Sequence, residues 1–172
     1  MTSILKVDEV QNTAGNSILK VDEIQDAAGK KILQNTGSIL QVRSRQMDGR
    51  DSITSSSFTA TSFSHTITPT SSSSKVLVVF MTGLNTQASG RDGQLTVYRD
   101  STELSGETHG LTYIKGDSSR IQIPVHLTVL DSPATTSSVT YKLYAKSSSG
   151  GNIEVPVTSS ESTTITLIEV SA

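Results

Sequence analysis

Apolar and polar positions follow two different rhythms along this chain, one up to residue 42 and another after residue 57. In the first part, SILKVDEVQNTAGN (residues 3–16) is followed directly by SILKVDEIQDAAGK (residues 17–30). A partial third copy follows, with Ile32 and Leu33 placed fourteen residues after Ile18 and Leu19. Self-similarity at a fixed spacing indicates a repetitive architecture.

Each repeat is too short to bury its own apolar side chains. Fixing the backbone costs about 1–2 kcal/mol per residue, whereas burying one aliphatic side chain returns about 1.5–3 kcal/mol. Neighbouring copies of the chain can supply the missing interior along a shared axis. We therefore predict an oligomeric stem over residues 1–42. Its expected core positions are Ile4, Leu5, Val7, Val10, Ile18, Leu19, Val21, Ile24, Ile32 and Leu33.

The repeat is compatible with two conformations of the stem. In an extended stem, ILKVDEV forms a strand, and Gly15 and Gly29 take the positive-φ position of a turn. In a helical stem, fourteen residues make two heptads with an a/d seam. The glycines interrupt that seam, and Gln11 and Gln25 fall on it. The pattern favours the extended stem, and the helical stem is the alternative.

Residues 43–57 are polar and contain a turn signal at Asp48–Gly49, so they are expected to form a neck with one strand around residues 42–46. From Phe58 onward, apolar residues alternate with Ser and Thr, which is typical of strands with one face toward water. Strands are predicted at 58–60, 63–67, 75–85, 94–100, 102–104, 111–114, 120–130, 137–147, 153–157 and 163–170.

Three details shape the predicted head domain, residues 58–172. KVLVVFMTGLN (75–85) is the most apolar run, so we expect a central strand buried on both faces. Pro124 lies within a predicted strand and cannot donate to a ladder, which indicates an edge strand or a bulge. SSSGGN (147–152) is typical of a hairpin loop. Short strands without a helical period predict an all-β, jelly-roll-like antiparallel sandwich.

Composition narrows the function. Hydrophobic residues make up 34% of the chain and Ser plus Thr about 30%, so burial shared between subunits is expected. A net charge of −2 without a basic block argues against nucleic acid. The lack of a long apolar run argues against membrane insertion. Lys6, Asp8 and Glu9 stand where a signal peptide is apolar, so synthesis in the cytoplasm without a signal peptide is expected.

Residues with catalytic or metal-binding potential are scattered. His65, His109 and His126 form no His-x-His pair, and the chain contains no cysteine, so neither a metal site nor a cofactor is expected. No G-x-S-x-G motif is present, and although Glu103, Glu107 and Glu154 are candidates for a glycosidase pair, their spacing singles out no two of them. We therefore predict that the protein is not an enzyme; a depolymerase or esterase is the alternative class.

Ligand contacts on a sandwich are expected in its loops rather than its strands. The candidate loops are 86–93, 105–119 and 147–152. Arginine forks and aromatic faces anchor many interfaces, which makes Arg91 and Tyr113 plausible contact residues for carbohydrate or protein. The candidate receptor contacts are Thr86, Gln87, Arg91, Asp92, His109, Tyr113 and Lys115.

The whole pattern resembles the tail-fibre-like, receptor-binding appendage proteins of tailed bacteriophages, marine ones especially. The stem residues Ser3–Gly15 and Ser17–Gly29 carry the resemblance first. The stretches ILQVRS (39–44), SSSFTATSF (55–63), ITPTSSSSKVLV (67–78) and STTITLIEVSA (162–172) resemble the head domain that follows such stems. These motifs are patterns of strands and turns rather than catalytic signatures.

The resemblance implies a homotrimeric virion appendage with a receptor-facing, sandwich-like tip, and it transfers no binding residues. The expected partners are other virion proteins, contacted through the stem, and a glycan or protein of the host surface. Because the repeat starts within the first residues, the stem itself is expected to dock on the particle. A capsid head fibre or decoration protein is the structural alternative, and a cellular lectin is a third that leaves the repeat without a use.

Overall fold

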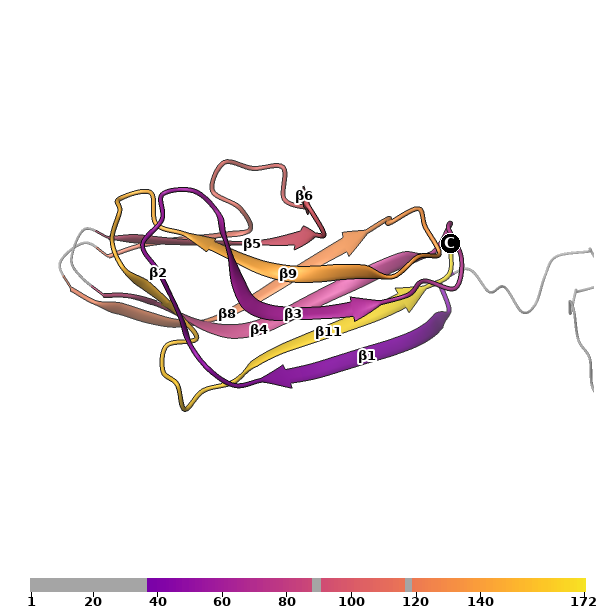
Figure 1. Cartoon of the computed structure of the whole chain (residues 1–172), viewed down its shortest axis with the longest axis horizontal. Helices are drawn as coiled ribbons and strands as arrows, with labels where there is room; N and C mark the ends of the chain where they lie inside the picture. The colour runs from indigo at the N-terminus through magenta and orange to yellow at the C-terminus, as the bar shows by residue number, and fades with distance from the viewer. Residues whose placement is uncertain (1–36, 88–90, 117–118) are drawn as a thin grey trace, which may run out of the picture. The chain divides into compact units, whose positions relative to one another are not determined.

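The computed structural model describes residues 37–87, 91–116 and 119–172. These residues form eleven strands in two antiparallel sheets that pack face to face (Figure 1). The prediction of an all-β antiparallel sandwich is confirmed. The two full repeats and the ten predicted stem core positions lie outside the described residues.

The first sheet has six strands around the long strand β4 (Lys75–Thr86). Along one edge of β4 run β11 (Thr163–Val170) and then β10 (Ile153–Val155). Outside them lie β1 (Ile39–Met47), which pairs with β11, and β2 (Asp51–Ile53), which pairs with β10. β8 (Ile121–Asp131) pairs with the opposite edge of β4, so the strand that contains Pro124 is an edge strand, as predicted.

The second sheet has five strands. Its order begins β3 (Thr59–Ile67), β9 (Val139–Lys146) and β5 (Asp92–Arg99). The far edge of β5 pairs with two short strands, β6 (Thr102–Glu103) and β7 (Thr112–Lys115). The tight link predicted between residues 94–100 and 102–104 is confirmed, with Asp100 at a φ of 51° in the turn.

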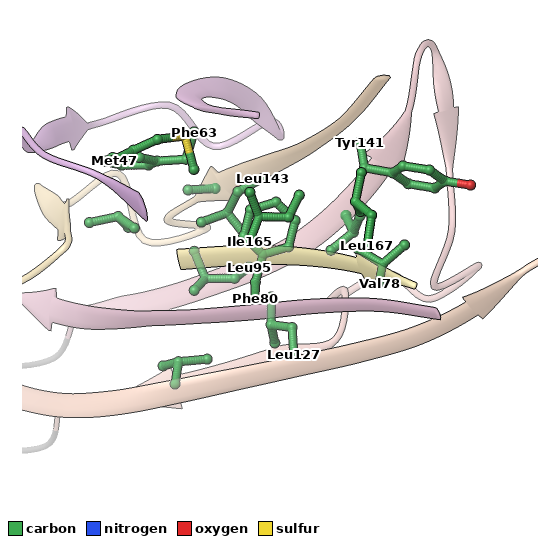
Figure 2. Close-up of a cluster of buried hydrophobic side chains, with 14 of the residues drawn as sticks. Met47, Phe63, Val78, Phe80, Leu95, Leu127, Tyr141, Leu143, Ile165 and Leu167 are labelled. Atoms are coloured by element: carbon green, nitrogen blue, oxygen red, sulfur yellow. The ribbon is translucent and has the colours of Figure 1, made fainter. Parts of the chain in front are cut away.

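The core lies between the sheets and comes from alternate residues of each strand (Figure 2). β9 and β11 alternate buried with half-buried residues along their whole length, as their sequence pattern predicts. The largest fully buried side chains of this core are Tyr141, Phe63, Phe80, Ile67, Leu84, Leu95, Leu143, Ile153, Ile165 and Leu167. Burial of one such side chain stabilises the fold by about 1.5–3 kcal/mol.

One polar cluster joins the two sheets beside this core. Arg99 Nη1 of β5 donates to both carboxylate oxygens of Asp131 in β8, each at 2.7 Å. The Tyr141 hydroxyl of β9 donates to Asp131 Oδ2, also at 2.7 Å. Burial raises the pKa of Tyr141 far above its usual value, and the hydrogen bond to Asp131 adds to the shift. The buried carboxylate of Asp131 and the buried hydroxyl of Tyr141 therefore both have hydrogen-bond partners, and these bonds fix the packing of the two sheets.

Two strands occupy the region that the sequence pattern assigned to the end of the stem and the neck. β1 begins at Ile39 and runs through the expected boundary at residue 42, while β2 lies within residues 43–57. The side chains of Met47 and Ile53 belong to the core. The strand expected around residues 42–46 is part of β1, but its start at Ile39 and the short strand β2 were not predicted, because β1 buries only one of its nine side chains and β2 has only three residues.

Two further expectations are wrong. The 147–152 loop is not a hairpin, because it connects β9 in one sheet to β10 in the other. β4 is central in its sheet, but over residues 75–81 it is buried on one face only: its outward side chains Leu77 and Val79 are half-buried, and Met81 is 47% exposed. The pattern of apolar residues shows that a strand face is suited to burial, but it does not tell whether the same chain or another chain covers that face.

No helix long and apolar enough to cross a membrane occurs in the residues that the structure describes.

Candidate binding surfaces

The predicted contact residues fall into two groups with different surroundings. Thr86, Gln87, Arg91 and Asp92 lie at the ends of β4 and β5, where the 147–152 loop also passes. The Gln87 N–H donates to the Asn152 carbonyl at 3.1 Å, and Arg91 Nη1 donates to the Ser149 carbonyl at 2.6 Å. Two of the three candidate loops therefore meet at this end of the sandwich.

Thr86 and Asp92 are not available as contact residues, because both are buried. The Asp92 carboxylate accepts hydrogen bonds from the backbone N–H groups of Ser148 and Ser149 and from Gln94 Nε2. Burial alone would raise the pKa of Asp92, but hydrogen bonds, led by those from Ser149 and Gln94, outweigh burial and hold it far below its usual value. Asp92 therefore orders the loop instead of facing outward. Its sequence position beside a turn could not reveal this role.

The second group lies on the outer side of the five-stranded sheet and is exposed. His109 belongs to the loop between β6 and β7, and its ring centroid lies 4.8 Å from that of Tyr113 in β7 at an interplanar angle of 47°. His109 Nδ1 is 3.3 Å from Gln94 Oε1. Lys115 ends the same strand and is exposed. This arrangement presents an aromatic pair and a cation to solvent, which suits stacking on a sugar ring or a protein side chain.

The three histidines lie on three separate elements. His65 of β3 is half-buried, and burial followed by the nearby charges of Arg45 and Arg43 lowers its pKa. His126 is exposed on β8, opposite Met81 of β4. Among the described residues, no group of three His, Asp or Glu side chains is placed to hold a metal ion.

Two of the three glutamates considered as catalytic candidates are held by structural hydrogen bonds. Glu103 accepts from the Thr96 hydroxyl and from backbone N–H groups of the loop that follows it, at Ser105 (2.9 Å) and Gly106 (2.7 Å). Burial opposes ionisation of Glu103, but these bonds and that of the Ser105 hydroxyl outweigh it and lower its pKa. Glu107 is exposed in the same loop.

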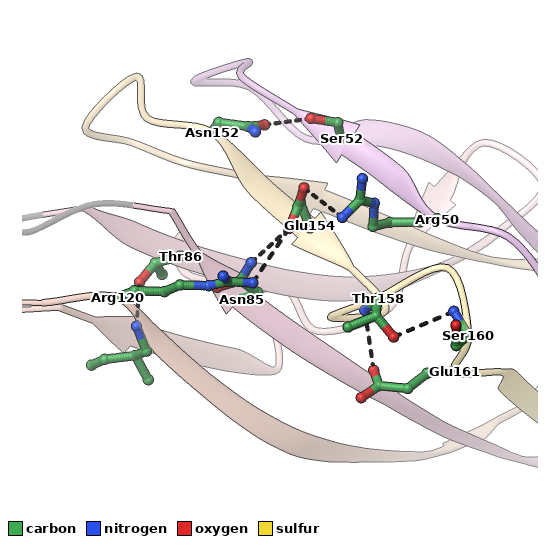
Figure 3. Close-up of polar contacts among 11 residues, drawn as sticks. Arg50, Ser52, Asn85, Thr86, Arg120, Asn152, Glu154, Thr158, Ser160 and Glu161 are labelled. Carbon is green, nitrogen blue, oxygen red and sulfur yellow. Dashed lines mark hydrogen bonds and ion pairs between the residues drawn. The ribbon is translucent and has the colours of Figure 1, made fainter.

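Glu154 forms the centre of a polar cluster that joins β10 and β4 to the residues just before β2 and β8, at one end of the six-stranded sheet (Figure 3). Its carboxylate is 3.0 Å from Arg50 Nη1 and accepts a hydrogen bond from Asn85 Nδ2 at 2.6 Å. Arg120 Nη2 lies 3.9 Å away from the same carboxylate, and Arg120 Nε donates to Asn85 Oδ1. Glu154 and Asn85 are buried, so the cluster satisfies an otherwise costly charge.

Sequence pattern did not predict a groove on the outer side of the six-stranded sheet. The loop between β10 and β11 folds over β4 there, and a Cβ on Gly83 would lie only 2.8 Å from Val157 Cγ2, which explains the glycine. Glu161 stays exposed at the rim, where its carboxylate accepts from the Thr158 N–H at 3.3 Å (Figure 3). The groove has a volume of about 640 Å³ and is lined by Met81, Thr82, Gly83, Gln122, Ile123, Pro124, His126, Val157, Ser160, Glu161, Ser162 and Thr164.

No protein-family model and no curated protein matches this chain. Solved structures with a similar fold include that of the infectious bursal disease virus Gt strain, at 14% identity over 90% of this chain and a TM-score of 0.37. The VP2 subviral particle of the same virus shows 15% identity over 90% of this chain and a TM-score of 0.32. A mutant VP2 protein in derived T=1 particles shows 13% identity over 99% of this chain and a TM-score of 0.32.

This chain spans between 42% and 44% of the length of the chains in those three structures.

Proposed function

We propose that this chain is a non-enzymatic structural protein of a virion: a homotrimeric tail fibre or spike that docks through its N-terminal repeats and contacts the host through its sandwich. The observation that carries the proposal is a duplicated fourteen-residue leader in front of a β-sandwich. Such a leader gains an apolar interior only from neighbouring copies, because its own residues cannot repay the entropy of ordering. The resemblance of the leader to phage appendage stems points the same way.

The receptor-contact surface of this proposal is the exposed second group described above. His109, Tyr113 and Lys115 combine an aromatic pair with a cation on the outer side of the five-stranded sheet. Arg91 is half-buried and already donates to the carbonyl of Ser149, so we assign it to holding the 147–152 loop and not to binding a ligand.

Native mass spectrometry of the full chain tests the oligomeric part. We expect a mass of three chains, each of 18.2 kDa. A deletion of residues 1–36 keeps β1 whole, since that strand starts at Ile39, and it should dissociate at concentrations where the full chain stays assembled. A full-length chain that stays monomeric at every concentration tested would contradict the proposal.

Binding to an array of bacterial surface glycans tests the receptor part. The full chain should bind a subset of the glycans, and Tyr113→Ala should weaken that binding by at least about tenfold. Ser62→Ala, an exposed change on β3 of the same sheet, serves as the control and should bind normally. Release of free sugar from any array member would contradict the non-enzymatic reading, because a binding module leaves its ligand intact.

A further inference from the structure

The outward face of β1, β11, β4 and β8 carries a continuous apolar row. Strand register places Leu77 of β4 opposite Leu130 of β8 on one side and Ile168 of β11 on the other. Ile168 in turn lies opposite Val42 of β1. Because residues paired across neighbouring strands point to the same side, these four side chains form one row across the sheet. We call the outward residues of these four strands the bare face.

Several large side chains of the bare face are open to solvent. Ile39 is 64% exposed, Leu130 57%, Val42 54% and Met81 47%. Contiguous apolar area of this kind on a soluble protein marks a contact surface or an aggregation hazard, whereas single exposed apolar residues need no explanation. The register makes the apolar row contiguous, so it is a patch of this kind and not a set of single exposed residues.

The bare face is also almost without charge. Its polar outward residues are Ser44, Gln46, Asn85, Gln122, His126, Thr128, Thr164 and Thr166, and Lys75 is a charged residue at one end. A second copy of the same face can approach it without like-charge repulsion, which a charged face could not allow. An uncharged apolar surface is therefore suited to contact its own copy.

The edge of β1 is a poorer contact site than the face. Arg43 and Arg45 lie opposite Leu167 and Ile165 in the register and thus point to the inner side of the sheet. Arg45 Nη1 reaches the Ser64 carbonyl of β3 at 3.5 Å. Charged residues that point inward on an edge strand disfavour addition of another strand. Copies should therefore meet through the face and not through strand pairing.

The apolar part of the bare face lies at the end where the leader joins the sandwich. The leader and residue 36 precede Gly37, whose N–H donates to the Ser171 carbonyl at 2.9 Å, and β1 then starts at Ile39. Ile39 pairs with Val170, two residues along β11 from Ile168 of the apolar row, and Lys75 pairs with Val170 on its other side, while the opposite end of the face carries Gln46, Met81 and His126. Copies held together by their leaders would bring this end closest to a shared axis.

We propose that the bare face is the surface through which copies of this chain pack against one another in the assembled protein, with the row Val42, Ile168, Leu77 and Leu130 nearest the axis. The proposal rests on the homo-oligomer of the proposed function and assigns its contact surface. It also explains why VLVVFM (76–81) is apolar at every position, since the neighbouring copy covers the side chains that the sandwich leaves open.

Charge substitutions in the full chain test this surface. Leu130→Glu should raise the concentration at which half of the assembly dissociates by about thirtyfold, the loss typical of a central interface residue. Tyr113→Glu places the same charge at a similarly exposed position on the other sheet and should leave that concentration unchanged. Equal effects of the two variants, or no effect of Leu130→Glu, would overturn the assignment. Val42→Glu repeats the test from a different strand in case Leu130→Glu fails to fold.

Thiol labelling separates this proposal from the proposed function. The chain has no cysteine, so Thr128→Cys on the bare face and Thr66→Cys on β3 give single exposed thiols on the two sheets. In the assembled protein we expect the Thr128→Cys thiol to react with a maleimide several times more slowly than the Thr66→Cys thiol. Equal rates in a confirmed trimer would overturn the bare-face assignment and leave the trimer intact. Slow labelling in an assembly that is not a trimer would support the face and contradict the trimeric stem.

Discussion

The outer faces of the two sheets differ, although their inner faces form one shared core. On the five-stranded sheet, the loop after β6 covers β5, so that Gln94 and Thr96 are fully buried although they point away from the core. Beyond that cover the face is polar, with Lys142 and Lys146, and the rings of Tyr98 and Tyr144 stack at 3.9 Å. On the six-stranded sheet, Leu77, Val79 and Met81 have no such cover except at the groove.

This difference shows two ways to complete a sandwich. A sheet face can be shielded by its own chain or made polar, as on the five-stranded sheet, and the molecule then needs nothing more on that side. A face that stays apolar and exposed to water is unfavourable in free energy, and contact with another molecule removes this penalty. The contrast is what directs receptor contacts to one sheet and self-association to the other in our proposals.

The largest expected effect comes from disturbing the cover of the five-stranded sheet at Gly110. Gly110 has a φ of 71°, and a Cβ there would lie 2.6 Å from the Leu95 carbonyl oxygen and 2.9 Å from Phe58 Cζ. Gly110→Ala should lower the free energy of unfolding by about 3 kcal/mol or more, because it adds a clash to the backbone strain. Urea unfolding measures the loss.

Gly106→Ala is the matched control for this prediction. Gly106 lies in the same loop with a φ of 68°, but a Cβ there would meet nothing within 4 Å. Its cost should be that of the backbone strain alone, about 1 kcal/mol. Equal losses in the two variants would mean that the loop does not press on β5 as the structure describes.

The next effect concerns the carboxylate that holds this cover. Glu103→Gln keeps the size of the side chain but removes the charge that accepts from Thr96, Ser105 and Gly106, and should cost about 1–3 kcal/mol. Glu107→Gln changes an exposed carboxylate of the same loop and should be nearly neutral. Thermal unfolding of both variants checks the difference, and comparable shifts in Tm would contradict it.

The pH dependence of that variant sharpens the same point. The pKa of Glu103 is lowered in the folded protein, so its stabilisation is present above the ordinary value of 4.5 and is lost as the pH falls through the lowered value. The stability gap between the wild type and Glu103→Gln should therefore be widest near about pH 7 and shrink below about pH 4. A gap that stays constant across this range would mean that ionisation of Glu103 plays no part.

Glu169 provides an internal reference within the same titration. It is fully buried, and hydrogen bonds from Gln41 and Thr70 outweigh burial and lower its pKa. The loss of stability that protonation of Glu169 causes at low pH should be the same in the wild type and in Glu103→Gln, because both chains keep Glu169.

The smallest expected effect is on the open face. Val79→Thr replaces an outward, half-buried residue of β4 and should change the stability of the dissociated chain by less than about 0.5 kcal/mol. Val78→Thr makes the same change on the neighbouring, fully buried side chain and should cost about 1–3 kcal/mol, since the hydroxyl finds no partner there. Similar losses measured below the dissociation concentration would show that the outer side of β4 is covered by its own chain.

Most of the sandwich was predictable because its strands have strong local patterns. The alternation in β9 and β11 gave their buried sides, Pro124 indicated the edge position of β8, and the short link after Asp100 indicated the pairing of β5 with β6. Only residues 42–46 of β1 were expected as a strand, and β2 was not predicted, because both are polar or short and pairing partners distant in the sequence hold them in place. The sequence could not predict which candidate contacts are exposed. Asp92 and Tyr113 both lie beside a turn, yet Asp92 is buried and Tyr113 is exposed.

By itself, the sequence determined the all-β class, the positions of most strands and the existence of a repeated leader, because periodicity and turn chemistry are local properties. Only the tertiary structure decided which strands share a sheet, that the 147–152 loop crosses between sheets, and which outer face stays open. The physical reason is that an apolar pattern shows which side chains gain from burial but not which surface buries them. On β9 the opposite sheet meets that need, whereas on the outer side of β4 the described residues leave Met81 47% exposed.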